Sequence, residues 1–333
     1  MAAANTNERT DLKIAMVGFG EAAAAFVAGW TRNAPEYTTA YDIKTDTAGP
    51  VRSRKIEEYE EAKVRGCETP DEAVAGADVI FSLVTADQAL AAAASVAGGL
   101  DRDSLYLDCN SCAPDTKLQA AAAIAEAGGR YVDVAVMAPV HPALHRTPLL
   151  VSGSDAKEAI SVMSQLEMSV RQVEGDIGAA SSIKMLRSIM MKGMEALAAE
   201  CVLASRRAGV DDIVLDSLEQ TYPGFGWKAR AAQMLNRMMV HGHRRAAEMR
   251  EAALTAQQLG IPNRMTQATV DWQQQIGDLA LDGVGSGYGD LADKILEALS
   301  LKTAAMEKSQ TDGITEDQRP DGGSQTTLEE VEE

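Results

Sequence analysis

One segment constrains the fold of this chain more than any other: the turn Gly18-Phe19-Gly20-Glu21-Ala22-Ala23, which has the form G-x-G-x-x-A. It follows a short apolar run, residues 13–17, which is typical of a buried β-strand. An alanine-rich stretch, residues 21–32, comes next and predicts a helix. The turn therefore lies at the amino end of a helix, where peptide N–H groups have no acceptor within the helix and favour an anion.

Each small residue of this turn has a physical reason. Gly18 permits a tight bend, and Gly20 has no Cβ, so a pyrophosphate can approach the backbone. Ala23 is small enough to let the helix and the strand pack closely. The pattern predicts a dinucleotide site in which Gly18, Gly20, Glu21 and Ala22 bind the cofactor.

An acidic residue indicates which dinucleotide to expect. Asp42 lies 22 residues after Gly20 and directly follows a second predicted strand, residues 38–41. Its carboxylate can accept hydrogen bonds from the ribose hydroxyls of the adenosine and would repel a 2′-phosphate. NAD is therefore favoured as the cofactor. NADP remains an alternative because three cations follow closely and could bind a 2′-phosphate: Lys44, Arg52 and Arg54.

Strands and helices alternate through the first half of the chain. Strands are predicted at residues 13–17, 38–41, 79–84, 105–107, 131–136 and 149–151, and helices at 21–32, 54–64, 89–96 and 114–126. This alternation predicts an α/β fold with a doubly wound parallel sheet of the Rossmann type. After residue 178 only helices are predicted, at 179–208, 211–220, 228–259 and 264–280.

These patterns predict the division of the chain into domains. We expect a flexible tail at 1–10, a dinucleotide-binding domain at 11–177, an all-helical domain at 178–307 that completes the site, and a disordered acidic tail at 308–333.

Composition excludes several classes of function. The formal net charge of −18 argues against nucleic acid as a partner, because phosphate binding needs a basic surface. No stretch of 18 uninterrupted apolar residues exists, and residues 1–10 lack the apolar core of a signal peptide, so we expect a cytoplasmic protein without a membrane partner. Cys109 and Cys112 have C-x-x-C spacing but no second pair, so we interpret them as reduced thiols and expect no metal site.

The predicted helix at 179–208 has two faces. One is an apolar stripe that we expect to be its packing face: Ile183, Leu186, Met190, Met194, Leu197 and Cys201. Lys184, Ser188 and Glu195 fall together on a different face, with Ser181 and Lys192 beside them. From periodicity alone, a lysine beside an apolar stripe is usually solvated, so a chemical role for Lys184 is left open at this point.

Four segments resemble, in order, the landmarks of the β-hydroxyacid dehydrogenases and 6-phosphogluconate dehydrogenases: residues 18–23, 108–114, 133–139 and 178–188. The resemblance covers residues 12–275 and is strongest to a poorly characterised, phosphogluconate-dehydrogenase-like branch. Segments similar to 132–137 and 184–188 recur in that branch, the latter with a Lys-Gly pair like Lys192-Gly193. The resemblance implies a Rossmann domain followed by an all-helical domain of the 6-phosphogluconate dehydrogenase type.

The resemblance also implies roles for single residues. Lys184 matches the residue that relays the proton of the substrate hydroxyl while a hydride passes between substrate and nicotinamide. Burial and neighbouring cations such as Arg187 and Lys192 would lower its pKa and suit it to this role. Leu83 and Val84 match the pair that lines the cofactor, and Ser111 matches the hydroxyl residue between nicotinamide and substrate. We also expect Asn110, Ser188 and Lys192 to bind the substrate, and either Arg187 or Lys192 could bind an acidic group of it.

Two departures from the superfamily pattern leave the substrate open. Ser188 stands where asparagine is usual, and Met137-Ala138-Pro139 replaces the Ser-Gly-Gly that commonly holds a substrate carboxylate. His141, His145 and Arg146 follow this altered loop, and we expect His141 to contact the substrate. The run His241-Gly242-His243-Arg244-Arg245 contains two histidines whose rings would point apart on a helix, so it predicts no metal site, although either arginine could contact substrate.

Together these features predict an NAD(P)-dependent oxidoreductase that acts on a small hydroxy or oxo compound, expected to be a carboxylic acid. Two alternatives remain, an imine reductase and a non-catalytic NAD-binding sensor. In relatives the helical half packs against another subunit, so we expect a homodimer or a multiple of it. Three methionines look exposed on the long helices and would serve this contact: Met234, Met238 and Met239.

Overall fold

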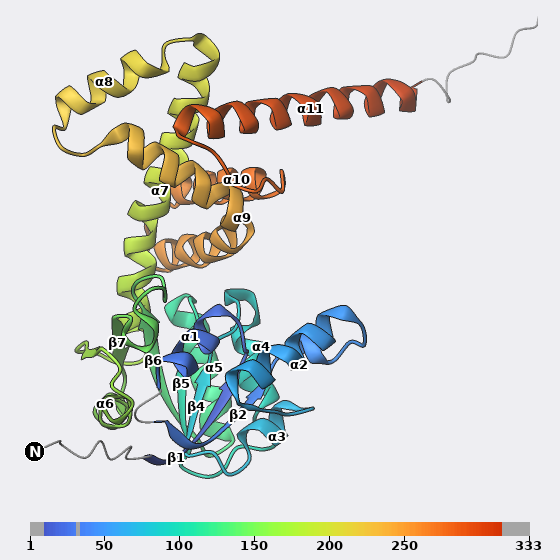
Figure 1. Ribbon diagram of the computed structural model, residues 1–333. Coiled ribbons are helices and arrows are strands. Elements are labelled where there is room, and N and C mark those ends of the chain that lie inside the picture. Colours follow the sequence, from blue (N-terminus) through green and yellow to red (C-terminus); the bar gives the residue numbers. More distant parts are fainter. Residues whose placement is uncertain (1–9, 31–33, 315–333) are drawn as a thin grey trace, which may run out of the picture. The chain divides into compact units, whose positions relative to one another are not determined.

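The computed structural model describes residues 10–30 and 34–314 (Figure 1). The chain forms two compact units. One contains residues up to 197 together with 241–278, and the other contains 198–240 together with the residues from 279 onward. No described helix is long and apolar enough to cross a membrane.

The first unit contains an eight-stranded sheet among its described residues, with the order β3-β2-β1-β4-β5-β6-β7-β8. The strands are β1 (Thr10–Val17), β2 (Pro35–Tyr41), β3 (Arg65–Gly66), β4 (Val79–Ser82), β5 (Leu105–Asp108), β6 (Arg130–Val136), β7 (Leu149–Ser152) and β8 (Val170–Gln172). The strand order reverses between β1 and β4, and in sheets of this kind ligands bind in the crevice at that point.

The expectation of a parallel sheet is correct except at one pair. β7 runs antiparallel to β6, while every other neighbouring pair is parallel. The segment between β6 and β7 holds only the short helix η3 (Leu144–Arg146), which is too short for the crossover that a parallel pair requires. The two shortest strands, β3 and β8, were not predicted.

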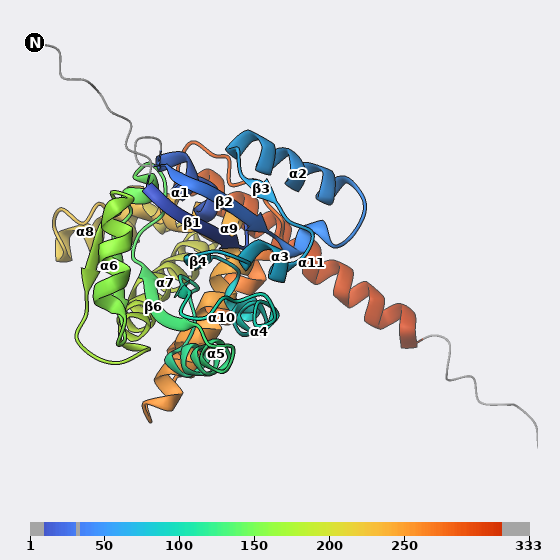
Figure 2. The ribbon, with the colours of Figure 1, turned by 90° about the horizontal axis from the view of Figure 1, so that it is seen from below.

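Helices cover both faces of the sheet, as a doubly wound fold requires (Figures 1 and 2). α1 (Glu21–Gly29), α2 (Pro50–Ala62) and α6 (Ala156–Gln165) pack on one face with Ile14, Phe81 and Leu107. α3 (Pro70–Val74), α4 (Ala89–Ser95) and α5 (Pro114–Glu126) pack on the other face, mainly against Ala15, Ile80 and Tyr106. Successive strand residues point to opposite faces, so both cores are built from the same strands.

Helices alone follow β8. They are α7 (Ala179–Ala208), α8 (Asp211–Thr221), α9 (Trp227–Gln258), α10 (Arg264–Gly277) and α11 (Tyr288–Ile314). The first part of α7, the second part of α9 and α10 belong to the same compact unit as the sheet. α11 continues seven residues past the predicted domain end at 307, and most of the predicted tails lies outside the described residues.

The apolar stripe of α7 is not its packing face, which corrects the expectation from the sequence. Ile183, Leu186, Met190 and Leu197 are exposed, and Met190 retains 65% of its accessible surface. The buried face of this helix segment contains four polar residues instead, Ser181, Ser188, Lys192 and Glu195, together with the apolar Ala180, Met185 and Ala196. Burial of polar groups is tolerated because each of them finds a partner, as described below.

A row of polar residues crosses the sheet at one level. Strand pairing places Ser82 of β4 beside Asp108 of β5, Asp108 beside Asp133 of β6, and Asp133 beside Ser152 of β7. All four side chains are completely buried. The row lies at the carboxyl ends of β4 and β5, beside the edge at which ligands bind in sheets of this type.

Candidate functional site

The glycine turn has the geometry expected for a dinucleotide site. Gly18 has φ +85°, and a Cβ added there would lie 2.6 Å from the carbonyl oxygen of Leu83 and 2.7 Å from Cγ1 of Val84. The turn and the segment after β4 therefore approach as closely as they do only because residue 18 is glycine. A Cβ at Gly20 would meet no atom within 4 Å, so this side of the turn is open.

The first turn of α1 leaves its peptide N–H groups available to a phosphate. Its N-cap is Gly20, which provides no side-chain hydrogen bond to the helix. The N–H groups that follow, including those of Glu21 and Ala22, have no acceptor within a helix, and the helix dipole adds partial positive charge there. The structure therefore fits a dinucleotide whose pyrophosphate lies against Gly20.

Asp42 ties the end of β2 to this turn. One carboxylate oxygen accepts the N–H of Phe19 at 2.9 Å, and the other accepts the N–H of Lys44 at 3.0 Å. The ammonium of Lys55 lies 3.9 Å from the carboxylate and also contacts the carbonyl of Phe19. Asp42 thus holds the turn in shape, and each oxygen retains a lone pair for a ribose hydroxyl.

Two of the cations that could favour NADP already have acidic partners. Arg52 pairs with Glu68 at 2.8 Å, and Arg54 pairs with Glu57 at 3.2 Å. A 2′-phosphate would have to compete with these carboxylates for either guanidinium. This arrangement supports the preference for NAD that Asp42 predicts.

Lys184 lies near the start of α7 and is partly exposed. Burial lowers the pKa of its ammonium to about 8, with the cations Lys117 and Lys192 acting in the same direction and Glu248 opposing them. Lys192 was expected as such a neighbour, whereas Lys117 and Glu248 were not. Because the ordinary value is about 10.4, this shift makes the neutral amine accessible near neutral pH.

Lys192 and Glu248 form an ion pair beside Lys184. The ammonium of Lys192 lies 2.9 Å from the carboxylate of Glu248 and 3.2 Å from the hydroxyl of Ser188. Burial would raise the pKa of Glu248, but Lys192 and Lys184 outweigh it and hold that pKa below its ordinary value. The site therefore contains two lysines and one carboxylate that stays ionised.

Asn110 connects the segment after β5 to the segment after β4. Its side-chain oxygen accepts the N–H of Val84 at 2.7 Å, and its amide nitrogen donates to Ser82 at 2.9 Å. The side chain is 2% exposed and thus sets the position of Val84. Ser111, the next residue, is partly exposed, as are Leu83 and Val84.

Lys184 acts electrostatically on the same segment after β5. Its positive charge lowers the pKa of both Cys109 and Cys112, which flank Asn110 and Ser111. Burial still raises the pKa of each thiol to about 12, so both cysteines are inert at neutral pH. The glycine turn, residues 83–84, residues 109–112 and Lys184 therefore form one connected region of a single compact unit.

Of the two histidines after β6, His145 lies at the far end of α1 from the glycine turn. His145 is buried against Gly29, at the last residue of α1, where a Cβ would fall 1.9 Å from its Nδ1. Gly29 is about 12 Å along the helix from Glu21, given a rise of 1.5 Å per residue. Burial lowers the pKa of His145. His141 is exposed, and its expected contact with the substrate remains a prediction.

Three residues of the basic run on α9 pair with three different acidic residues. Arg245 binds the buried Glu195, which also accepts a hydrogen bond from Gln273 at 3.1 Å. Arg244 lies 3.3 Å from Glu21, the first residue of α1. His243 lies 2.8 Å from Asp278. Nowhere in the described part of the chain do three or more metal-ligating side chains gather.

Comparisons with known proteins agree with this geometry. Residues 13–169 match the NAD binding domain of 6-phosphogluconate dehydrogenase, and residues 205–276 match a domain of unknown function, DUF1932. A conserved hypothetical protein from Sinorhizobium meliloti 1021 is 35% identical, with a TM-score of 0.67 over 87% of this chain and 97% of that chain. The chain belongs to the 3-hydroxyacid dehydrogenase-like superfamily.

Two further solved structures have the same fold. A conserved protein of unknown function, MTH1747, described as structurally similar to 3-hydroxyacid dehydrogenases, is 26% identical, with a TM-score of 0.62 over 82% of this chain and 100% of that chain. The 3-hydroxyisobutyrate dehydrogenase of Mycobacterium tuberculosis is 13% identical, with a TM-score of 0.65 over 85% of this chain and 99% of that chain. The expected architecture, a Rossmann domain followed by an all-helical region, is confirmed.

Proposed function

We propose that this protein is an NAD-dependent dehydrogenase or reductase that interconverts a small hydroxy acid and the corresponding oxo acid. One observation carries the proposal. A lysine with a pKa lowered to about 8 lies in the same compact unit as the dinucleotide turn, next to the segment that lines the carboxyl end of β5. When bound, the nicotinamide accepts or supplies the hydride.

We assign to Lys184 the transfer of the substrate's hydroxyl proton. In the oxidation direction its neutral amine accepts the proton of the substrate hydroxyl while the carbon loses a hydride and the C=O bond forms. In the reverse direction its ammonium returns that proton to the carbonyl oxygen. A pKa of about 8 lets the same group act both ways near neutral pH, which is the condition for efficient general acid–base catalysis.

Lys192, Ser188 and Ser111 are assigned to the substrate. The ammonium of Lys192 can attract a carboxylate, and the hydroxyl that it contacts, Ser188, can donate to the substrate. Glu248 competes with such a carboxylate for Lys192, so the site accepts an acid only if it rearranges or binds the acid through further donors. Ser111 is partly exposed, next to Cys112, whose pKa the charge of Lys184 lowers, and we assign it a position between substrate and nicotinamide.

The cofactor is assigned to the turn and the three segments around it. Gly18, Gly20, Glu21 and Ala22 would hold the pyrophosphate, Asp42 the adenosine ribose, and Leu83 and Val84 the nicotinamide half. The open side of Gly20 and the two free acceptor positions of Asp42 support this placement. The ion pairs of Arg52 and Arg54 support NAD over NADP.

A substrate screen tests the proposal. Oxidation of NADH and reduction of NAD are followed optically with panels of hydroxy acids, oxo acids, sugar acids and imines, with Lys184→Ala as the matched control. We expect turnover with a hydroxy or oxo acid that the control lacks. Turnover confined to imines would instead make the protein an imine reductase. Tight NADH binding without turnover of any panel would identify it as an NAD-binding sensor.

A further inference from the structure

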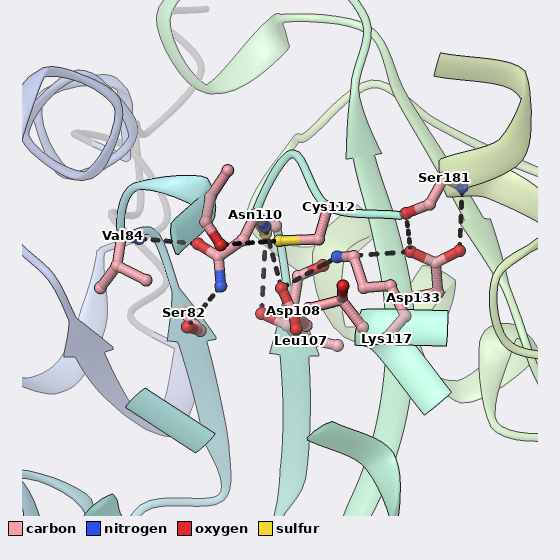
Figure 3. A network of polar contacts seen from close by, with 12 residues as sticks. Ser82, Val84, Leu107, Asp108, Asn110, Cys112, Lys117, Asp133 and Ser181 are labelled. Atoms are coloured by element: carbon pink, nitrogen blue, oxygen red, sulfur yellow. Dashed lines mark hydrogen bonds and ion pairs between the residues drawn. The ribbon is translucent and has the colours of Figure 1, made fainter. Parts of the chain in front are cut away.

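A completely buried lysine lies where two hydrogen-bond networks of the candidate site meet. One network leads to α7 and the other to the segments after β4 and β5, and we call them the two arms of the site. Lys117, on α5, has no exposed surface, and its ammonium lies 2.9 Å from the carboxylate of Asp108 and 3.4 Å from that of Asp133 (Figure 3). It also donates to the main-chain carbonyl of Asp108 at 2.6 Å. Both carboxylates belong to the polar row that crosses the sheet, so Lys117 bridges two adjacent strands.

Asp133 carries one arm, toward α7. Its carboxylate accepts the N–H of Gly178 at 3.1 Å, the N–H of Ser181 at 2.9 Å and the hydroxyl of Ser181 at 2.6 Å. These bonds satisfy the first turn of α7 and fix where that helix begins. Lys184 follows Ser181 by three residues, less than one helical turn later, so the position of Asp133 determines that of Lys184.

Asp108 carries the other arm, toward the cofactor segments. Its carboxylate accepts the N–H of Asn110 at 2.9 Å and the hydroxyl of Tyr131 at 2.6 Å. Asn110 in turn holds the N–H of Val84. Figure 3 shows the ammonium of Lys117 between Asp108 and Asp133, where the two arms meet.

The charge of Lys117 is permanent. Burial would lower its pKa, but the two carboxylates outweigh burial and raise that pKa above its ordinary value. The charged and titratable groups with the largest effects on Lys184 come from several parts of the chain: Lys117 from α5, Lys192 on α7 itself, Glu248 from α9 and the thiol of Cys109 after β5. Lys117 has the largest effect among the cations.

We propose that Lys117 is a positioning residue for the reaction, which sets the start of α7 through Asp133 and supplies a fixed positive charge beside Lys184. A buried charge is costly, and a neutral donor could bridge two strands at a lower cost in desolvation. The positive charge gives what a neutral donor could not, because it favours the uncharged amine of Lys184. This inference rests on the proposed role of Lys184 as the proton-transfer group.

Competitive labelling of lysine amines tests it without any turnover. The protein, free of cofactor, is reacted with trace acetic anhydride from pH 6 to 11, and the extent of modification at Lys184 is read by mass spectrometry. We expect a labelling midpoint near pH 8 in the wild type. In Lys117→Met the midpoint should rise by about one pH unit or more, since a neighbouring cation is lost. An unchanged midpoint overturns the proposal.

Two further variants separate charge from structure. Asp133→Asn loosens the start of α7 but removes a negative charge, so the midpoint of Lys184 should not rise. A purely structural role of the network predicts a rise in both Lys117→Met and Asp133→Asn, because water would reach Lys184 in either. Lys55→Met removes another buried lysine, which lies near Asp42, and should leave the midpoint of Lys184 unchanged.

The wild type alone can overturn the proposal if Lys117→Met does not fold. Lys117 should stay unlabelled over the whole range in which the protein remains folded, while Lys184 titrates near pH 8. A midpoint of Lys184 near its ordinary value of about 10.4, or ready labelling of Lys117 at neutral pH, contradicts the proposal. Neither readout depends on the substrate, so a failed substrate screen and a failed labelling experiment are distinguishable.

Discussion

The carboxylate of Asp42 accepts the N–H of Phe19 at 2.9 Å, so the residue expected to bind the adenosine ribose also holds the glycine turn in place. Asp42 is 8% exposed, and its second oxygen accepts the N–H of Lys44. A substitution of Asp42 therefore changes both the preference for a cofactor and the shape of the pyrophosphate site. Cofactor preference is therefore best measured on the wild type, in which the carboxylate and the turn are both intact.

We predict that the wild type binds NADH at least about tenfold more tightly than NADPH, or about 1.4 kcal/mol. The 2′-phosphate would lie against the carboxylate of Asp42, and both neighbouring arginines are occupied by glutamates. Fluorescence titration of each cofactor at one ionic strength measures the ratio. Equal or tighter binding of NADPH would contradict this prediction and direct attention to Lys44, Arg52 and Arg54.

The pKa of Lys184 predicts the pH dependence of turnover. Oxidation needs the neutral amine, so kcat/KM for oxidation should rise with pH and level off above about pH 8. Reduction needs the ammonium, so kcat/KM for reduction should be level below about pH 8 and fall above it. Initial rates across pH 6 to 10 in both directions check this. Two profiles that bend in the same direction would exclude Lys184 as the shared proton carrier.

Glu248 should act on Lys184 in the direction opposite to Lys117. Its negative charge favours the ammonium, so Glu248→Gln should lower the pKa of Lys184 and move both pH profiles to lower pH. The same substitution leaves Lys192 without its partner at 2.9 Å, so affinity for an acidic substrate should change as well. Glu251→Gln, three residues further along α9, serves as the control; its carboxylate accepts the N–H of Ala113. A shift to higher pH in Glu248→Gln would contradict the assignment.

Lys184 should lower the stability of the protein at neutral pH. Its pKa is depressed in the folded state, so below about pH 8 the folded protein holds an ammonium in surroundings that favour the neutral amine. Holding that charge costs free energy. Above pH 8 the folded state releases the proton first, and the unfolded state holds it until about pH 10.4, so stability rises with pH in that interval. Lys184→Met should thus raise the free energy of unfolding at pH 7 by on the order of 1–3 kcal/mol.

The decisive measurement is how the difference in free energy of unfolding between Lys184→Met and the wild type changes with pH. The gain in Lys184→Met should shrink as the pH rises from 8 toward 10, measured by urea unfolding at each pH. The exposed Lys157 provides a control, since Lys157→Met should change stability by no more than about 0.5 kcal/mol at any pH. A gain that is independent of pH would mean that the amine of Lys184 is not perturbed.

A homodimer, or a multiple of it, remains a prediction. The methionines first assigned to the contact are wrong for that purpose, because Met234, Met238 and Met239 are buried within the chain. The exposed stripe of α7 is the better candidate, with Leu186 at 42% and Met190 at 65% exposure. A second copy would cover apolar surface that water otherwise contacts.

Light scattering on charge substitutions tests the assembly. The wild type should have at least twice the mass of one chain at micromolar concentration, and Leu186→Glu with Met190→Glu should reduce it to one chain. Leu118→Glu introduces the same change at an exposed leucine of α5 and should keep the assembly. A wild type with the mass of a single chain would refute the prediction.

The sequence predicted those parts of the fold that local signals specify. α5 begins at Pro114, a favoured first helical residue, and ends before Gly128-Gly129, so its predicted bounds were correct. The inward face of α7 could not be predicted the same way. An amphipathic pattern assigns apolar residues to the core, whereas Ser181, Lys192 and Glu195 are buried because Asp133, Glu248 and Arg245 satisfy them from distant parts of the chain.

In the candidate site, too, local signals predicted some residues, while others are brought in only by tertiary contacts. Lys184, Ser111 and the glycine turn were found from motifs, but Lys117 and Glu248 belong to no motif and reach the site only through tertiary contacts. Strand register brings Ser82, Asp108 and Asp133 into line, and register is not visible in a single sequence. A buried lysine in an otherwise ordinary helix, such as Lys117 in α5, carries no sequence signal of its own.

Lys184→Ala is the most direct test of the proposed reaction. The substitution removes the proton carrier but leaves the glycine turn, Asp42 and the Asp133 bonds at the start of α7 unchanged. Turnover should drop by about 10² to 10⁴-fold, the range typical of general acid–base residues. NADH affinity should stay within about twofold, or about 0.4 kcal/mol, because no cofactor contact is assigned to Lys184.

The matched variant is Ser188→Ala, one turn further along α7. It removes a hydroxyl that contacts Lys192 at 3.2 Å and that we propose orients the substrate, so it should raise KM more than it lowers kcat. Near-normal turnover of Lys184→Ala on the true substrate would mean that another group carries the proton. His145 is a poor replacement because it is buried at the far end of α1, so the exposed His141 would be the next residue to substitute.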